Sequence, residues 1–203
     1  MIKASLLWKR YKDKIVFIIF LLQITLFYKL IQMHIQTGYI FKISFIDDKI
    51  PFIPLFVMPY LLYAVVLLLP FILTFRNKKY FFASSAAFLF ASLVCNFFFV
   101  LFPTMTIRPE IAPSDIFNKL VLWVYAIDGV TNLFPSEHVA FSVLSNLCLT
   151  KINKRIAYYL IPITGLIVFS TVFIKQHYIP DILGGLVLAF ASFLIFKRII
   201  RSS

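Results

Sequence analysis

The sequence predicts an all-α polytopic membrane protein, built as a bundle of six transmembrane helices in a single domain covering residues 1–203. Of the 203 residues, 62% are hydrophobic and only 14% are charged, and the mean hydropathy is +0.94. A soluble domain of this length could not bury so much apolar surface, so we expect lipid to be the solvent. Backbone groups must be hydrogen-bonded within the membrane, which favours helices over open strands.

Six apolar runs define the expected helices. They cover residues 15–33, 52–75, 80–102, 136–150, 156–174 and 181–200. A helix needs about 20 apolar residues to cross the hydrocarbon core. Five runs meet or approach that length, whereas the fourth is short, so we expect it to begin below the outer membrane surface. The first run follows a basic N-terminus but lacks the small-residue cleavage site of a signal peptide, so we expect it to remain as an anchor.

The charge distribution predicts the orientation in the membrane. If the N-terminus is cytoplasmic, fourteen of the twenty basic residues lie on that side: Lys3, Lys9, Arg10, Lys12, Lys14, Arg76, Lys78, Lys79, Lys151, Lys154, Arg155, Lys197, Arg198 and Arg201. Seven of the eight acidic residues lie outside. This positive-inside pattern predicts a multi-pass protein of the cell membrane with both termini in the cytoplasm. The net charge of +12 therefore reflects topology, and no nucleic-acid partner is expected.

The longest outer connection, residues 103–135, should contain an interfacial helix between the third and fourth membrane helices. From Ser114 onward, apolar residues recur at helical spacing: Ile116, Leu120, Trp123, Val124 and Ile127. Ser114 is the expected N-cap, and Asp115 suits the first turn. Such a helix would lie at the depth of the lipid headgroups. Two roles are open for it, a structural strut or a wall for a lipid substrate.

Ionisable residues gather at the outer ends of the later helices. His177 and Asp181 are four residues apart, a spacing that lets the carboxylate reach one ring nitrogen of the imidazole. His138 lies upstream, where a polar segment enters the fourth apolar run. The fourth helix runs inward from the outer face and the fifth helix returns to it. We therefore expect both histidines to meet at the outer face, together with Arg108. Membrane-edge ionisable residues favour a functional site.

Three short motifs carry a resemblance to a known family. RPE (108–110), PSEH (135–138) and S-T-x5-H-x3-D (170–181) resemble, in order, the signature motifs of the type 2 phosphatidic acid phosphatase superfamily. The resemblance covers about residues 103–185. The form KQHYxxD and the non-glycine residue in PSxH look most like the branch of inositol phosphorylceramide and sphingomyelin synthases and their bacterial relatives. Each motif alone is weak, but all three in order on one membrane face are specific.

The resemblance implies catalytic roles for these residues. His177 would attack phosphorus and form a phosphohistidine, with Asp181 orienting the ring. His138 would protonate the leaving alkoxide and then deprotonate the acceptor. Arg108 would bind phosphate oxygens, and Ser136, with the amides that open the fourth helix, would add hydrogen-bond donors. No cofactor and no metal are implied.

Departures from the phosphatase motifs concern charge. Leu101 and Thr171 stand where the phosphatase branch carries a Lys and an Arg. Lys175 is the candidate replacement for one of these missing phosphate-binding cations. Glu137 stands where the phosphatases have Gly; it could pair with a cation of the site or bind an alcohol acceptor.

The function expected from this resemblance is hydrolysis of a lipid phosphate ester or diphosphate at the extracytoplasmic face. Phosphatidic acid, phosphatidylglycerophosphate and a polyprenyl diphosphate are the candidate substrates, and membrane lipids are the expected surroundings. One alternative is a lipid phosphotransferase that passes a phosphoryl group or phospho-headgroup to an alcohol. The non-enzyme alternative is a transporter or an inactive lipid-binding relative. The oligomeric state is open.

Overall fold

A computed structural model describes the backbone of residues 2–201 and the side chains of residue 8 and residues 10–201. The side chains of Lys3 and Lys9, both predicted to be cytoplasmic, lie outside the described residues. The regular elements in this range are helices: α1 (Ile2–Leu22), the π-helical turn η1 (Gln23–Phe27), α2 (Tyr28–His34), α3 (Ser44–Asp47), the 3-10 turn η2 (Pro54–Phe56), α4 (Val57–Thr74), α5 (Lys78–Leu101), α6 (Ile116–Asp128), α7 (Glu137–Ile152), α8 (Lys154–Phe173) and α9 (Ile179–Arg201). The all-α prediction is confirmed.

Five of the six predicted membrane helices are long and apolar enough to cross a membrane. They are Arg10–His34, Pro54–Thr74, Lys78–Leu101, Lys154–Phe173 and Ile179–Arg201. The chain is therefore a multi-pass membrane protein. The fourth apolar run forms α7, which has 16 residues. At 1.5 Å per residue α7 is about 24 Å long, shorter than a hydrocarbon core of about 30 Å, so the count of six spanning helices is not confirmed.

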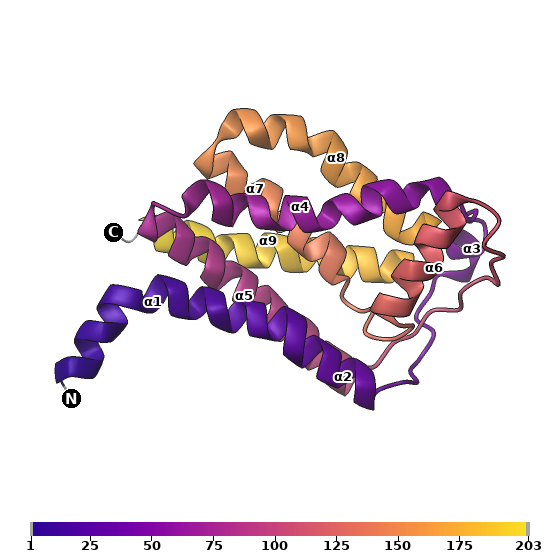
Figure 1. The fold of residues 1–203 in the computed structure, drawn as a ribbon, viewed down its shortest axis with the longest axis horizontal. Coiled ribbons are helices and arrows are strands. Elements are labelled where there is room, and N and C mark those ends of the chain that lie inside the picture. The colour runs from indigo at the N-terminus through magenta and orange to yellow at the C-terminus, as the bar shows by residue number, and fades with distance from the viewer. Residues whose placement is uncertain (1, 202–203) are drawn as a thin grey trace.

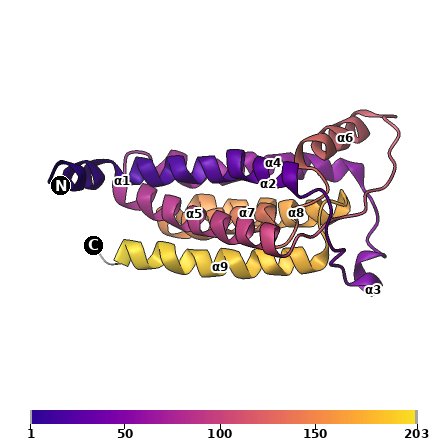
Figure 2. The same ribbon diagram turned by 90° about the horizontal axis from the view of Figure 1, so that it is seen from below.

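Helix α7 occupies the centre of the bundle, packed against α4, α5, α8 and α9 (Figures 1 and 2). The two chain ends lie at one end of the bundle, where α5 and α8 also begin (Figure 1). Helices α3 and α6 and the long loops lie at the opposite end, which we call the outer end because the charge pattern predicts that it faces outside. The basic turns and the histidines are thus separated along the bundle, as the charge pattern predicts.

Two features of the core set the position of α7. Aromatic rings of α1, α4, α5 and α7 pack against one another in the core. The ring centroids are 5.6 Å apart for Phe20 and Phe88 and 5.7 Å apart for Phe20 and Phe141. Helices α7 and α9 approach closely at Gly185. A Cβ atom there would lie 2.7 Å from the backbone oxygen of Ser136, so only glycine permits this contact.

Helix α6 forms as the periodicity predicts, but it begins one residue later. Its N-cap is Asp115, whose Oδ1 accepts a hydrogen bond from the Asn118 amide at 2.9 Å, because a carboxylate caps free helix amides well. Ser114, the expected cap, lies just outside the helix. Val121 and Val124 are buried against the outer end of α4, while Trp123 stays 55% exposed. The interfacial depth predicted for α6 remains a prediction.

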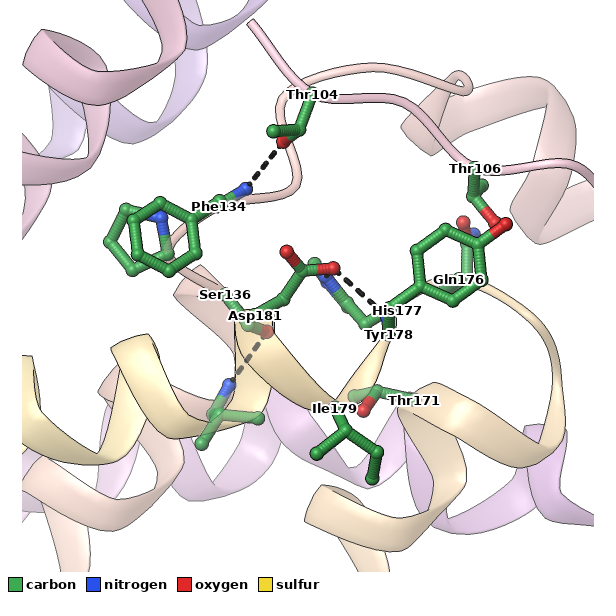
Figure 3. A network of polar contacts seen from close by, with 12 residues as sticks. Thr104, Thr106, Phe134, Ser136, Thr171, Gln176, His177, Tyr178, Ile179 and Asp181 are labelled. Carbon is green, nitrogen blue, oxygen red and sulfur yellow. Dashed lines mark hydrogen bonds and ion pairs between the residues drawn. The ribbon is translucent and has the colours of Figure 1, made fainter. Parts of the chain in front are cut away.

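The segment 103–108 connects two other outer loops. The hydroxyl of Thr104 accepts a hydrogen bond from the Phe134 amide at 2.9 Å (Figure 3). The hydroxyl of Thr106 donates to the backbone oxygen of Lys175 at 3.1 Å. The segments before α7 and before α9 are therefore tied to one strap of chain, and this strap carries Arg108.

Candidate active site

The two histidines meet at the outer end of the bundle. His138 is the second residue of α7, and His177 lies two residues before α9. Their ring centroids are 5.8 Å apart, with the ring planes at 60°. Both rings line a cavity of about 180 Å³ among α2, α4 and α7. One water molecule requires about 10–15 Å³ of such a volume. The cavity is many times larger, so it can admit a phosphate group.

The carboxylate of Asp181 lies beside the ring of His177. Its Oδ2 lies 3.4 Å from Nδ1 of His177, and the two side chains are almost completely buried. The same oxygen accepts the Tyr178 amide at 2.9 Å, which fixes the carboxylate at the start of α9 (Figure 3). Because Nδ1 faces the carboxylate, Nε2 is the ring nitrogen left for chemistry. This arrangement suits a nucleophilic imidazole that becomes positively charged.

A second carboxylate, which the sequence motifs did not reveal, lies beside His138. Oδ2 of Asp128, the last residue of α6, is 3.9 Å from Nε2 of His138. The Tyr60 hydroxyl of α4 donates to the same oxygen at 2.5 Å. The rings of Tyr60 and Tyr63 pack on the imidazole with centroids 4.6 and 4.5 Å away. Burial lowers the pKa of His138 to about 4, and the neighbouring Asp128 carboxylate opposes this shift. Asp128 therefore favours the protonated imidazole, which is the form that a general acid needs.

Arg108 reaches the edge of the site through Gln176. Its Nη2 donates to Oε1 of Gln176 at 2.5 Å, and its Nη1 donates to the Tyr125 backbone oxygen at 2.9 Å. The guanidinium also lies over the Tyr125 ring, 4.2 Å from its centroid. Burial lowers the pKa of Arg108 from its usual value, yet an arginine so placed keeps its charge. Gln176 lines the cavity, so Arg108 lies one side chain behind it.

Ser136 caps α7 and couples it to Asp181. Its Oγ accepts the Val139 amide at 3.3 Å, and its own amide donates to the Asp181 backbone oxygen at 3.0 Å (Figure 3). The side chain is fully buried. In this structure Ser136 therefore aligns the two motifs, and its hydroxyl is engaged with the helix rather than with the cavity.

The structure does not bring the ammonium group of Lys175 to the cavity. Lys175 has φ of 56°, a left-handed conformation that reverses the chain after α8. The amides of Gln176 and His177 then both donate to the Thr171 backbone oxygen, and their side chains line the cavity. Nζ of Lys175 instead donates to the Ile50 backbone oxygen. Partial burial lowers the pKa of Lys175 from its usual value.

Polar groups without partners line the cavity near His138. Glu137 is 9% exposed, and its Oε1 has no hydrogen bond among the described residues; nor have the two amide atoms of Asn132. The expected cation partners, Arg108 and Lys175, bond to other groups. This wall can therefore hydrogen-bond to a ligand, and hydroxyl groups fit it because each can both donate and accept.

The two motif histidines thus line one cavity, each beside a carboxylate, and Arg108 lies one side chain behind the cavity wall. Within residues 2–201, no group of three or more His, Cys, Asp or Glu residues is arranged to hold a metal ion. A family model, that of the PAP2 superfamily, matches residues 32–195. No curated protein and no solved structure matches the chain. The matched range contains both histidines and their carboxylate partners.

Proposed function

Because the chain belongs to the PAP2 superfamily, we propose that it is an integral membrane lipid phosphatase. Its substrate would be a lipid phosphate ester or diphosphate, cleaved at the extracytoplasmic face through a phosphohistidine. The observation that carries the proposal is the pairing across one cavity of His177 with Asp181 and of His138 with Asp128. Two histidines with their own carboxylates can divide the nucleophilic and acid roles.

In the first step, Nε2 of His177 attacks the phosphorus and the bond from phosphorus to the lipid oxygen breaks. Asp181 stabilises the imidazolium that forms on His177. His138 gives its proton to the departing oxygen, so the lipid leaves as a neutral alcohol. Arg108 balances the phosphate charge. Its guanidinium would exchange its hydrogen bond to Gln176 for a charge-assisted hydrogen bond to a phosphate oxygen.

In the second step, His138 takes a proton from water as the water oxygen attacks the phosphorus. The bond from phosphorus to His177 breaks, phosphate leaves and His138 is again protonated. The same base would serve an alcohol in place of water. The unpartnered atoms of Glu137 and Asn132 beside His138 favour phosphotransfer to an alcohol as the second candidate function.

Phosphate release from labelled phosphatidic acid by the purified protein tests the proposal, with other lipid phosphates and a polyprenyl diphosphate as parallel substrates. We expect release that persists in EDTA and an acid-labile phosphoprotein in the wild type. His177→Ala should abolish both. His34→Ala is the matched control, because His34 is exposed on α2, outside the motifs, and should leave both unchanged.

Adding glycerol, inositol or ceramide to the same reaction separates the two candidate functions. A hydrolase releases phosphate at the same rate with and without the added alcohol. A transferase forms a new phosphorylated product, and its release of phosphate falls accordingly. Equal activity in His177→Ala and the wild type would disprove the site assignment. Absence of turnover with every lipid phosphate would favour the non-enzyme alternative.

A further inference from the structure

Three apolar grooves open on the sides of the bundle near its outer end. One of them, about 340 Å³ beside Leu55, Met58 and Leu62, shares no wall residue with the His cavity, and two others remain. The α4–α6 groove has a volume of about 170 Å³, and its walls include Tyr60, Tyr63, Ala64, Trp123, Ile127 and His138. The α5–α9 groove is larger, about 570 Å³, and its walls include Phe90, Phe98, Phe134, Leu183, Val187 and Ala191. Either could receive the hydrocarbon chain of a lipid substrate, so size alone does not distinguish them.

Continuity with the His cavity does distinguish them. The α4–α6 groove and the cavity share four wall residues, Tyr60, Tyr63, Asp128 and His138. The α5–α9 groove shares no wall residue with the cavity. A chain in the α4–α6 groove would therefore meet the reacting phosphate directly at His138.

The reaction geometry selects the same groove. In-line displacement places the leaving oxygen opposite the attacking nitrogen of His177. That oxygen needs a proton, so it must lie next to His138, and in a lipid phosphate it carries the hydrocarbon chain. We propose that the α4–α6 groove binds the first part of the chain of the leaving lipid alcohol. This inference rests on the proposed phosphatase function.

The groove acts by orientation rather than by hydrophobic attraction. A chain that moves from the bilayer into an apolar groove gains little, because lipid tails are as apolar as the groove walls. What the groove fixes is the direction from which the leaving oxygen approaches His138. A misplacement of about 1 Å at a reacting centre can cost on the order of 100-fold in rate, so blocking the groove should have a large effect.

Two matched substitutions test the assignment. Ala64 lines only the α4–α6 groove and Ala191 only the α5–α9 groove, and both are exposed, so a phenylalanine at either fills a groove without entering the core. We expect Ala64→Phe to lower kcat/KM for dipalmitoyl phosphatidic acid by about tenfold or more and for chain-free para-nitrophenyl phosphate by less than about twofold. Ala191→Phe should change neither value. Selective loss in Ala191→Phe, or no loss in Ala64→Phe, would overturn the proposal.

Photolabelling provides a readout that needs no turnover. The inactive His177→Ala protein is labelled with phosphatidic acid that carries a diazirine near the start of its chain. Specific labelling is the part that excess unlabelled phosphatidic acid prevents and excess phosphatidylcholine does not. We expect this labelling at Trp123 and Ile127 of α6. Competed labelling on α5 or α9 instead, or none on α6, contradicts the groove assignment.

The two assays separate failure of the inference from failure of the function. If the wild type cleaves neither substrate, the proposed function fails, while the labelling still tests the groove. If Ala64→Phe impairs both substrates alike, the substitution has disturbed His138 itself, and the labelling decides.

Discussion

Replacing Asp128 by asparagine should lower the pKa of His138, and with it the protonated fraction, without changing the shape of the site. The carboxylate oxygen lies 3.9 Å from Nε2 of His138, and an asparagine oxygen can still accept the Tyr60 hydroxyl. At an effective dielectric constant of about 20, two unit charges at this distance attract by about 4 kcal/mol. The two side chains are 16% and 23% exposed, so solvent screens part of this attraction. We expect a loss of about 1.4–2.7 kcal/mol, or roughly 10- to 100-fold in rate.

The assay compares two leaving groups. A lipid alkoxide must be protonated as it leaves, whereas a nitrophenolate leaves without a proton. Asp128→Asn should therefore lower kcat/KM for phosphatidic acid by the stated factor and barely change it for para-nitrophenyl phosphate. Asp115→Asn is the matched control on the same helix, because asparagine caps a helix as well as aspartate does. An equal loss with both substrates, or no loss with either, would refute the acid-supporting role of Asp128.

Three further predictions concern the topology and the outer loops. Ser114→Cys should react with a membrane-impermeant thiol reagent added to intact cells, whereas Lys78→Cys should not; the reverse labelling would place the site in the cytoplasm. Lys175→Ala should keep kcat/KM within about fivefold of the wild type, because its ammonium bonds to a loop carbonyl; a larger loss, measured with phosphatidic acid, would return Lys175 to the phosphate site. Asp47→Ala should destabilise the protein by about 2–4 kcal/mol, measured as a lower Tm in detergent. The reason is that the buried Asp47 carboxylate accepts hydrogen bonds from the amides of Ile43 and Ile179 at 2.7 and 2.9 Å. An unchanged Tm would contradict this prediction.

The sequence predicts the helical fold and the meeting of the two motif histidines because both follow from periodicity and chain direction. Apolar runs define the helices. Between His138 and His177 the chain runs inward in one helix and outward in the next, so both histidines lie on the same face. The 16-residue α7 marks the limit of this reasoning. Whether a short apolar run spans the membrane or lies enclosed by longer helices depends on its neighbours, which periodicity does not specify.

The parts that could not be predicted depend on contacts between distant segments. Asp128 reaches His138 only because α6 ends against α4, where Tyr60 donates to its carboxylate. The sequence signal available for Asp128 was an acid just before Gly129, which is weak by itself. Lys175 illustrates the opposite case. The motif comparison makes it a candidate phosphate-binding cation, but its ammonium donates to the Ile50 backbone oxygen instead.

The central position of α7 has a consequence for the lipids around the protein. Ten of the thirteen residues of α7 from Glu137 to Leu149 are buried, so this helix packs mainly against other helices. When bilayer thickness changes, the outer helices adapt by tilting, at a cost of fractions of a kcal/mol per Å. His138 is attached to this enclosed helix, and the glycine contact at residue 185 joins the helix to α9. For the proposed lipid phosphatase we therefore expect turnover to be nearly constant across bilayers of different thickness, even though its substrates would be membrane components themselves.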